Sequence, residues 1–291
     1  AQGSVISVNG SQSDDELIYG SQAASNNGDL SIDSYAGNDL IIFYDDAAVN
    51  NGSIHLNSGV GDDAIFFASN AADSGGSIAV FSGPDNDTVS FGGDGENDQD
   101  SALYVDLGSG NDVFETFDVT EGGHSTVLGG EGEDQIHTQR GTIESTSRLL
   151  IDAGNGDDMV NLGMPPNYFS IPPVYFNFDG INDILLGAGA DICVINADVG
   201  RSTMQPASYL RVDLGADLDA DTIRIEYDAF NFFITNYSIG LDNRVGIPDA
   251  PSVWTGTDNG TDIVFTQSDQ TITFEGLGGV GGSIDPLDYF M

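Results

Sequence analysis

Apolar residues recur at fixed places in a repeat of about 24 residues, and this repeat covers the first two thirds of the chain. Each copy is centred on an aspartate, with one apolar residue seven positions before it and another two positions after it. Eight aspartates follow this pattern at nearly constant spacing: Asp15, Asp39, Asp63, Asp87, Asp112, Asp134, Asp158 and Asp183. A unit this short cannot bury a core of its own, so the copies are expected to stack on one another.

Within each copy, apolar and polar residues alternate with the period of a half-buried β-strand. In the third copy, Ile54 and Leu56 form the expected inner face of one strand, and Ile65 and Phe67 form that of the next. A Gly-x-Gly-Asn/Asp-Asp turn joins them, and its glycines permit positive φ. The variable stretch that follows, 69–76 in this copy, is expected to be a solvated loop. The sequence therefore predicts an all-β parallel β-solenoid (a β-helix or β-roll) of about eight such coils.

The repeat pattern predicts two regions. Residues 1–226 form the predicted solenoid, and 227–291 form an irregular C-terminal β cap, because an aromatic-rich run and Pro248 and Pro251 interrupt the pattern there. The first repeat begins at Val5 with no capping segment before it, which favours end-to-end association through unpaired strand edges.

Some positions expected to face outward are also apolar. Leu40, Ile42, Ala64 and Phe66 would form an apolar stripe on an outer face of the early coils. Such a stripe favours lateral self-association, although a thicker core is an equal interpretation.

The charge balance is extreme, with 47 acidic residues against six basic ones and a formal net charge of −41. Phosphates would be repelled, so nucleic acid is excluded as a partner, and anionic membrane surfaces are disfavoured. No apolar stretch is long enough for membrane insertion. The single cysteine, Cys193, cannot form an internal disulfide. Cations are the expected ligands.

Stacking the coils would place successive aspartates along one edge of the solenoid, only ~5 Å apart. Like charges at this spacing repel strongly. A hard divalent cation between neighbours would remove the repulsion, and Ca²⁺ suits the site best because it accepts six to eight oxygen ligands in a tolerant geometry. The alternative is that the aspartates are simple turn formers.

The turns resemble a known family. The segments 59–65, 108–114 and 154–160 are similar to the Gly-Gly-x-Gly-x-Asp-x-apolar-x nonapeptide of RTX proteins, and 180–193 resembles two nonapeptides in tandem. In that family the glycine turns and the aspartate bind calcium between adjacent coils of a β-roll. The coils of this chain are longer and carry one nonapeptide each, whereas RTX coils carry two, so we expect one calcium ladder, on one edge.

The expected metal ligands are the repeated turn acids and their neighbours. They are Asp39, Asp62, Asp63, Asp87, Asn111, Asp112, Asp134, Asp157, Asp158, Asp183 and Asp191. The Asp157–Asp158 pair could suggest a β-helix polysaccharide enzyme. Because similar acids recur in every coil, the pattern favours a scaffold without catalytic residues.

The C-terminal segments 260–277 and 287–291 resemble the tail of type I secretion substrates. Together these features predict a secreted, calcium-stabilised structural or adhesive solenoid of a bacterial cell surface or extracellular matrix, which self-assembles into a filament or surface layer. A surface glycan is a further candidate partner. The alternative is an accessory calcium-binding module of a larger secreted enzyme, of the protease or polysaccharide epimerase type.

Overall fold

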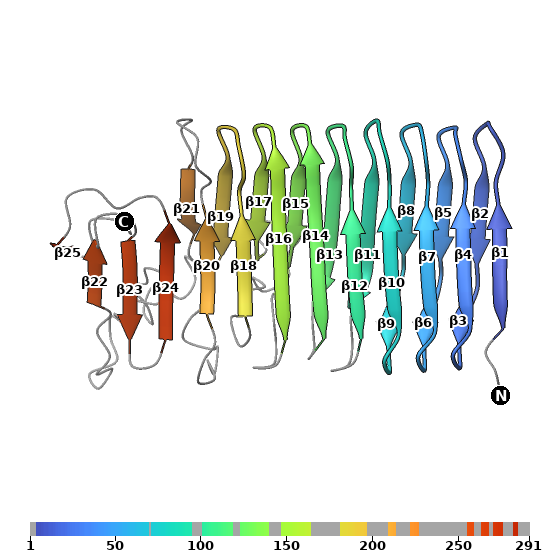
Figure 1. Ribbon diagram of the computed structural model, residues 1–291, viewed down its shortest axis with the longest axis horizontal. Coiled ribbons are helices and arrows are strands. Elements are labelled where there is room, and N and C mark those ends of the chain that lie inside the picture. Colours follow the sequence, from blue (N-terminus) through green and yellow to red (C-terminus); the bar gives the residue numbers. More distant parts are fainter. Residues whose placement is uncertain are drawn as a thin grey trace, which may run out of the picture.

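The protein is all-β over the part of the chain that the computed structural model describes. The described residues are 4–69, 71–94, 101–118, 123–139, 147–163, 181–196, 209–213, 222–226, 255–258, 263–267, 270–275 and 282–284. Among them there is no helix that could span a membrane. The strands form three sheets, and successive coils of the chain stack from the N-terminal end to the C-terminal end (Figure 1).

Sheet A is one of the two long layers and has 13 strands. Its strands, in spatial order, are β1 (Val5–Asn9), β4 (Asp29–Asp33), β7 (Ser53–Asn57), β10 (Ser77–Phe81), β12 (Ala102–Asp106), β14 (His124–Glu131), β16 (Arg148–Asn155), β18 (Ile181–Leu185), β20 (Tyr209–Asp213), β24 (Gln270–Glu275), β23 (Ile263–Gln267), β22 (Thr255–Asp258) and β25 (Gly282–Ile284). Pairing is parallel from β1 to β20 and on to β24, and antiparallel beyond it.

Sheet B is the second long layer, behind sheet A in Figure 1, and its nine strands are parallel. They are β2 (Glu16–Tyr19), β5 (Leu40–Phe43), β8 (Ala64–Phe67), β11 (Thr88–Asp94), β13 (Val113–Asp118), β15 (Gln135–Thr138), β17 (Met159–Leu162), β19 (Ile192–Asn196) and β21 (Thr222–Glu226). Each aspartate turn leads from a strand of sheet A into one of sheet B. The prediction of an all-β parallel solenoid is confirmed, and equivalent turn residues of the early coils are 24 positions apart.

A third, short sheet was not predicted. It consists of β3 (Ala24–Ser25), β6 (Ala48–Val49) and β9 (Ala72–Asp73). The expectation that 69–76 is a solvated loop is wrong, because Ala71 and Ala72 are fully buried there and β9 pairs with β6. Alanine is small enough to let this third side close tightly on the core.

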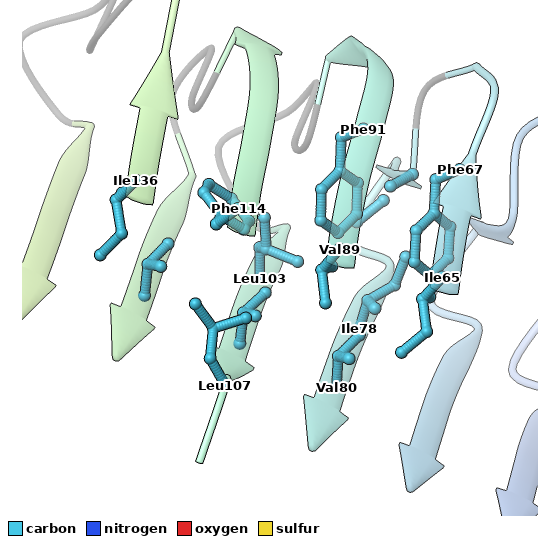
Figure 2. Close-up of a cluster of buried hydrophobic side chains, with 14 of the residues drawn as sticks. Ile65, Phe67, Ile78, Val80, Val89, Phe91, Leu103, Leu107, Phe114 and Ile136 are labelled. Atoms are coloured by element: carbon cyan, nitrogen blue, oxygen red, sulfur yellow. The ribbon is translucent and has the colours of Figure 1, made fainter. Parts of the chain in front are cut away.

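The core lies between the sheets and uses the predicted inner positions. Ile54, Leu56, Ile65 and Phe67 are all at most 2% exposed, and the apolar side chains of successive strands meet between the layers (Figure 2). The cysteine, Cys193, is also fully buried.

One core row consists of aromatic rings stacked from coil to coil. The ring centroids of Phe43 and Phe67 are 4.6 Å apart, and so are those of Phe67 and Phe91. Tyr19 continues the stack on Phe43 at 4.7 Å. The stack ends after Phe91 because the next position in this row is the buried Thr116.

The predicted boundary at residue 226 falls beside the segment 227–254, which lies outside the described residues. The candidate secretion tail contributes β23 and β24, and the latter extends sheet A by pairing with β20.

Candidate functional site

The turn between sheets A and B places one aspartate of each coil directly before a strand of sheet B. This set, here called the inner row, consists of Asp15, Asp39, Asp63, Asp87, Asp112, Asp134, Asp158 and Asp191. Because the strands pair in register, the row runs along the stack as one continuous ladder.

A hydrogen bond joins each member of the inner row to the next. The backbone N–H of Asp87, for example, donates to Oδ1 of Asp112, and that of Asp112 donates to Oδ1 of Asp134, over 2.7 and 2.8 Å. The same bond connects the whole row from Asp15 to Asp191, always at 2.7–2.8 Å. Every inner-row carboxylate from Asp39 onward therefore hydrogen-bonds its own coil to the preceding coil.

The other carboxylate oxygen of these side chains is enclosed without a partner. Seven inner-row aspartates are at most 2% exposed: Asp39, Asp63, Asp87, Asp112, Asp134, Asp158 and Asp191. In the first six the Oδ2 atom is buried and has no hydrogen-bond partner of ordinary geometry. The hydroxyls of Ser58 and Ser82 lie near enough to Asp63 and Asp87 to lower the pKa of each slightly. In the coil of Asp134, Oδ2 faces back towards Gly129 in β14, and a Cβ on Gly129 would lie 2.7 Å from this oxygen. An unpaired, buried carboxylate oxygen is costly for the ionised form.

Burial raises the pKa of five of the inner-row carboxyls. Desolvation, with a further rise from neighbouring carboxylates, raises the pKa of Asp87 to about 8 despite the hydrogen bond from Asp63. The pKa values of Asp112 and Asp158 are raised to about 7, again chiefly by desolvation. Burial also raises the pKa of Asp63 and of Asp134. The N–H bonds to Oδ1 thus offset only part of the cost of a buried charge.

The residue before each inner-row aspartate forms a second, exposed ladder. This outer row consists of Asp14, Asn38, Asp62, Asn86, Asn111, Glu133 and Asp157. Its hydrogen bonds run in the opposite direction: the N–H of Asn86 donates to Oδ1 of Asp62 in the coil before it, over 2.9 Å. Equivalent bonds link the neighbours of the row from Asp14 to Glu133, and Oδ1 of Asp157 accepts the N–H of Ala190 in the next coil. Asp14, Asn38, Asn86 and Glu133 were not predicted as site residues, although an acidic or amide residue before each turn aspartate from Asp15 to Asp158 is visible in the sequence.

One predicted ligand lies elsewhere. Asp183 is within β18, where it pairs with Leu150, and the turn position of that coil is taken by Asp191. The prediction that Asp183 continues the repeat is therefore wrong. The spacing from Asp158 to Asp183 is close to the length of one repeat, but the coil between Asp158 and Asp191 is 33 residues long.

The turns need positive φ at two positions, and close stacking forbids a Cβ at most of them. Gly132 has φ +137°, and a Cβ on it would overlap the carbonyl oxygen of Gly110 in the coil before. Asp85 occupies the equivalent position in its own coil with φ +82°, and Tyr35 occupies the other turn position with φ +74°. Non-glycine residues in this region carry strain of about 1–2 kcal/mol each.

Two substitutions at equivalent positions are expected to act in opposite directions. Gly132→Ala should lower the free energy of unfolding by several kcal/mol, since backbone must move to admit the methyl group. Asp85→Gly should raise it by roughly 1 kcal/mol, because relief of strain exceeds the added entropy of the unfolded chain. Denaturant unfolding followed by circular dichroism measures both, and equal destabilisation by the two changes would contradict this description of the turn.

Comparison with protein-family models, with curated proteins and with solved structures found no match. The case for a function therefore depends on the geometry of the ladder.

The donor set of the inner row fits a hard cation. The side-chain atoms of both rows that could bind a metal ion are carboxylate and amide oxygens. Six buried Oδ2 atoms among them have no hydrogen-bond partner. Among the described residues, no three His, Cys, Asp or Glu side chains converge to hold a metal by themselves. Neighbouring inner-row carboxylates would therefore have to share an ion, with main-chain or outer-row oxygens completing its shell.

Proposed function

We propose that this chain is a calcium-stabilised β-solenoid that serves as a structural or adhesive element outside a bacterial cell. The observation that supports the proposal most is the set of six buried inner-row carboxylates from Asp39 to Asp158, whose Oδ2 atoms have no hydrogen-bond partner. The structural role is supported by the regularity of the row, because a catalytic site would differ from coil to coil.

The energetics of the row favour a bound cation. One unit of pKa shift corresponds to about 1.4 kcal/mol. Asp87, Asp112 and Asp158 have pKa values raised from 3.8 to about 8, 7 and 7. Their combined ionisation cost is on the order of the whole stability of a typical domain, about 5–15 kcal/mol. At neutral or alkaline pH the folded row needs either protons or metal ions.

Calcium is the ion that the donors suit best. Asp39, Asp63, Asp87, Asp112, Asp134 and Asp158 would hold it through Oδ2, while their Oδ1 atoms keep the N–H bonds between coils. The exposed acids Asp62 and Asp157 and the amide oxygen of Asn111 would add oxygen ligands from the outer row. A bound ion would balance the negative charge of the inner row in each coil, because the chain has only six arginines against 47 acidic residues.

The location and assembly follow from the same features. A strongly acidic chain whose fold needs calcium suits an extracellular medium, where calcium is abundant and Kd values of about 10⁻⁴–10⁻³ M suffice. The resemblance of the C-terminal segment to type I secretion substrates supports export. Coils stacked along one axis suit a filament, a surface layer or a matrix element.

The proposal predicts that folding depends on calcium. At pH 8, the urea midpoint of the strand signal in circular dichroism should be far lower in chelator than in calcium, and titration with CaCl₂ should restore the midpoint with about one ion bound per pair of neighbouring inner-row aspartates. MgCl₂ should restore it poorly at the same concentrations, because Mg²⁺ gives up its water reluctantly. A urea midpoint that is the same with and without chelator at pH 8 would contradict the proposal.

A further inference from the structure

The Oδ2 atom of the inner-row aspartates faces the residue that comes five positions earlier in the chain. A Cβ on Gly10 would lie 2.6 Å from Oδ2 of Asp15, which repeats the contact of Gly129 in a distant coil. Serine hydroxyls hold the same place beside the carboxylates of Asp63 and Asp87. Because the coils stack in register, this place in every coil is here called the facing position. In chain order it is occupied by Gly10, Ser34, Ser58, Ser82, Leu107, Gly129, Ala153 and Leu186.

The facing position divides the ladder into two parts. Three successive early coils carry a serine there, and all three serines are fully buried. The later coils carry leucine, glycine or alanine at the same place, and the leucines and the alanine are fully buried as well. The carboxylates from Asp39 to Asp87 therefore have a hydroxyl beside Oδ2, whereas those from Asp112 onward have hydrocarbon or no side chain there.

The hydroxyl hydrogens of the facing serines are used elsewhere. Oγ of Ser34 donates to the carbonyl oxygen of Ser58 over 2.6 Å, and Oγ of Ser58 donates to that of Ser82 over 2.8 Å. Ser82 continues the series by donating to the carbonyl oxygen of Leu107 over 2.7 Å. A hydroxyl has one hydrogen, so the lone pairs that each Oγ still offers can only accept. An ionised carboxylate can likewise only accept.

Two buried acceptor oxygens thus meet in the coils of Asp63 and Asp87, where no described residue donates a hydrogen bond to Oδ2. Such a pair is costly in a protein interior. A cation bound by both oxygens removes the cost. Calcium binds neutral oxygens, such as carbonyls and water, beside carboxylates, and a hydroxyl offers the same kind of oxygen. Where the facing residue is apolar, the coil supplies one oxygen fewer, and its affinity for calcium should be lower.

We propose that the facing serines bind calcium together with the inner-row carboxylates of their own coils, and that the coils from Asp112 onward bind calcium more weakly. The inference rests on the proposed function and deepens it, because it names the residues that set calcium affinity and the order in which the ladder fills. As calcium rises, ions occupy the coils from Asp39 to Asp87 first. As calcium falls, the later coils lose their ions and loosen first.

The test uses two opposite substitutions in the full chain, followed by calorimetric titration with CaCl₂ at pH 8. The wild type should show a tight and a weak class of sites. Ser58→Ala should bind the ion of its own coil roughly tenfold or more weakly, as is usual when a group that supports a metal site is removed. The reverse change, Ala153→Ser, should move an ion from the weak class to the tight class. The control Ser31→Ala makes the first change on the exposed outer face of β4 and should titrate like the wild type.

Urea unfolding of Ser58→Ala separates a calcium ligand from a serine that only hydrogen-bonds. If the hydroxyl served the carbonyl of Ser82 alone, its loss would lower the urea midpoint equally in chelator and in calcium. We expect the larger drop in calcium. Equal drops, or a calcium affinity of Ser58→Ala that matches the wild type, would overturn this inference and leave the proposed function standing. A wild type that binds no calcium would overturn the proposed function, and the inference with it.

Discussion

In the absence of metal ions, the folded protein is expected to lose stability as the pH rises from about 4 to about 8. The folded-state pKa of Asp87 is raised from 3.8 to about 8, and those of Asp112 and Asp158 to about 7. Between the unfolded and folded pKa values, the folded chain binds more protons than the unfolded chain. The contribution of these three carboxyl groups to the free energy of unfolding is therefore fully present below about pH 4, and it is lost as the pH rises through 7 and 8.

This direction is opposite to that of ordinary acid denaturation, in which paired carboxylates are protonated and the fold is lost. Urea unfolding in chelator at pH 5 and pH 8 measures it, and the midpoint should be markedly lower at pH 8. Adding calcium should raise the midpoint at pH 8 far more than at pH 5, because ions and protons compete for the same oxygens. A chelated protein that is more stable at pH 8 than at pH 5 would contradict the description of the inner row.

The second large effect is expected from Asp112→Asn, which should stabilise the chelated protein and destabilise the calcium-loaded one. The Asn amide oxygen can still accept the N–H of Asp87, which Oδ1 of Asp112 accepts over 2.7 Å. In chelator at pH 8, the change removes a buried charge with a cost of roughly 4 kcal/mol and leaves an amide nitrogen to satisfy, at about 1–3 kcal/mol. The net gain is about 1–3 kcal/mol.

With calcium, the same variant should bind fewer ions than the wild type and unfold at lower urea. Asp112→Ala removes the hydrogen-bond acceptor as well, so it should be less stable than Asp112→Asn by about 1–3 kcal/mol in chelator. Its loosening should concentrate in the coils that carry Asp87 and Asp112, which hydrogen exchange can locate.

The matched control is Asp62→Asn, which makes the same change in the exposed outer row. Its amide oxygen can still accept the N–H of Asn86, and no buried charge is removed. Its chelated stability at pH 8 should stay within about 0.5 kcal/mol of the wild type. If Asp62→Asn and Asp112→Asn changed stability in chelator equally, burial of the inner row would not be the cause.

Much of the fold could be predicted because the repeat encodes it directly. The register of Ile54, Leu56, Ile65 and Phe67 repeats in each coil with the period of a strand, so both the sheets and the core positions follow from it. The inner row was found for the same reason. The outward apolar residues were also recognised, and Phe66 proves to be exposed on the outer face.

The errors arose where the period was broken. Asp183 has the expected spacing and an apolar residue two positions later, but it lies in a coil that is 33 residues long. The glycine pair before Asp191, at Gly187 and Gly189 with φ of +96° and +147°, was the stronger signal because the turn requires those conformations. The third sheet was missed because strands of two residues, such as β9, are too short to show a period.

Burial of the inner row could not be predicted from spacing alone. Aspartates in turns usually face solvent, and the sequence predicted only that they would form a row along one edge. The structure places them inside the corner of the coil, with Oδ1 paired and Oδ2 enclosed. This arrangement turns a charged turn residue into a group whose ionisation opposes folding.

The most direct test of the central claim is a crystal structure of the protein grown with calcium at pH 8, with ions located by anomalous scattering. The account predicts a file of calcium ions along the inner row, each within about 2.3–2.6 Å of Oδ2 atoms of neighbouring aspartates. A well-ordered solenoid at that pH without ions at the inner row, or with ions bound only by exposed outer-row residues, would contradict it.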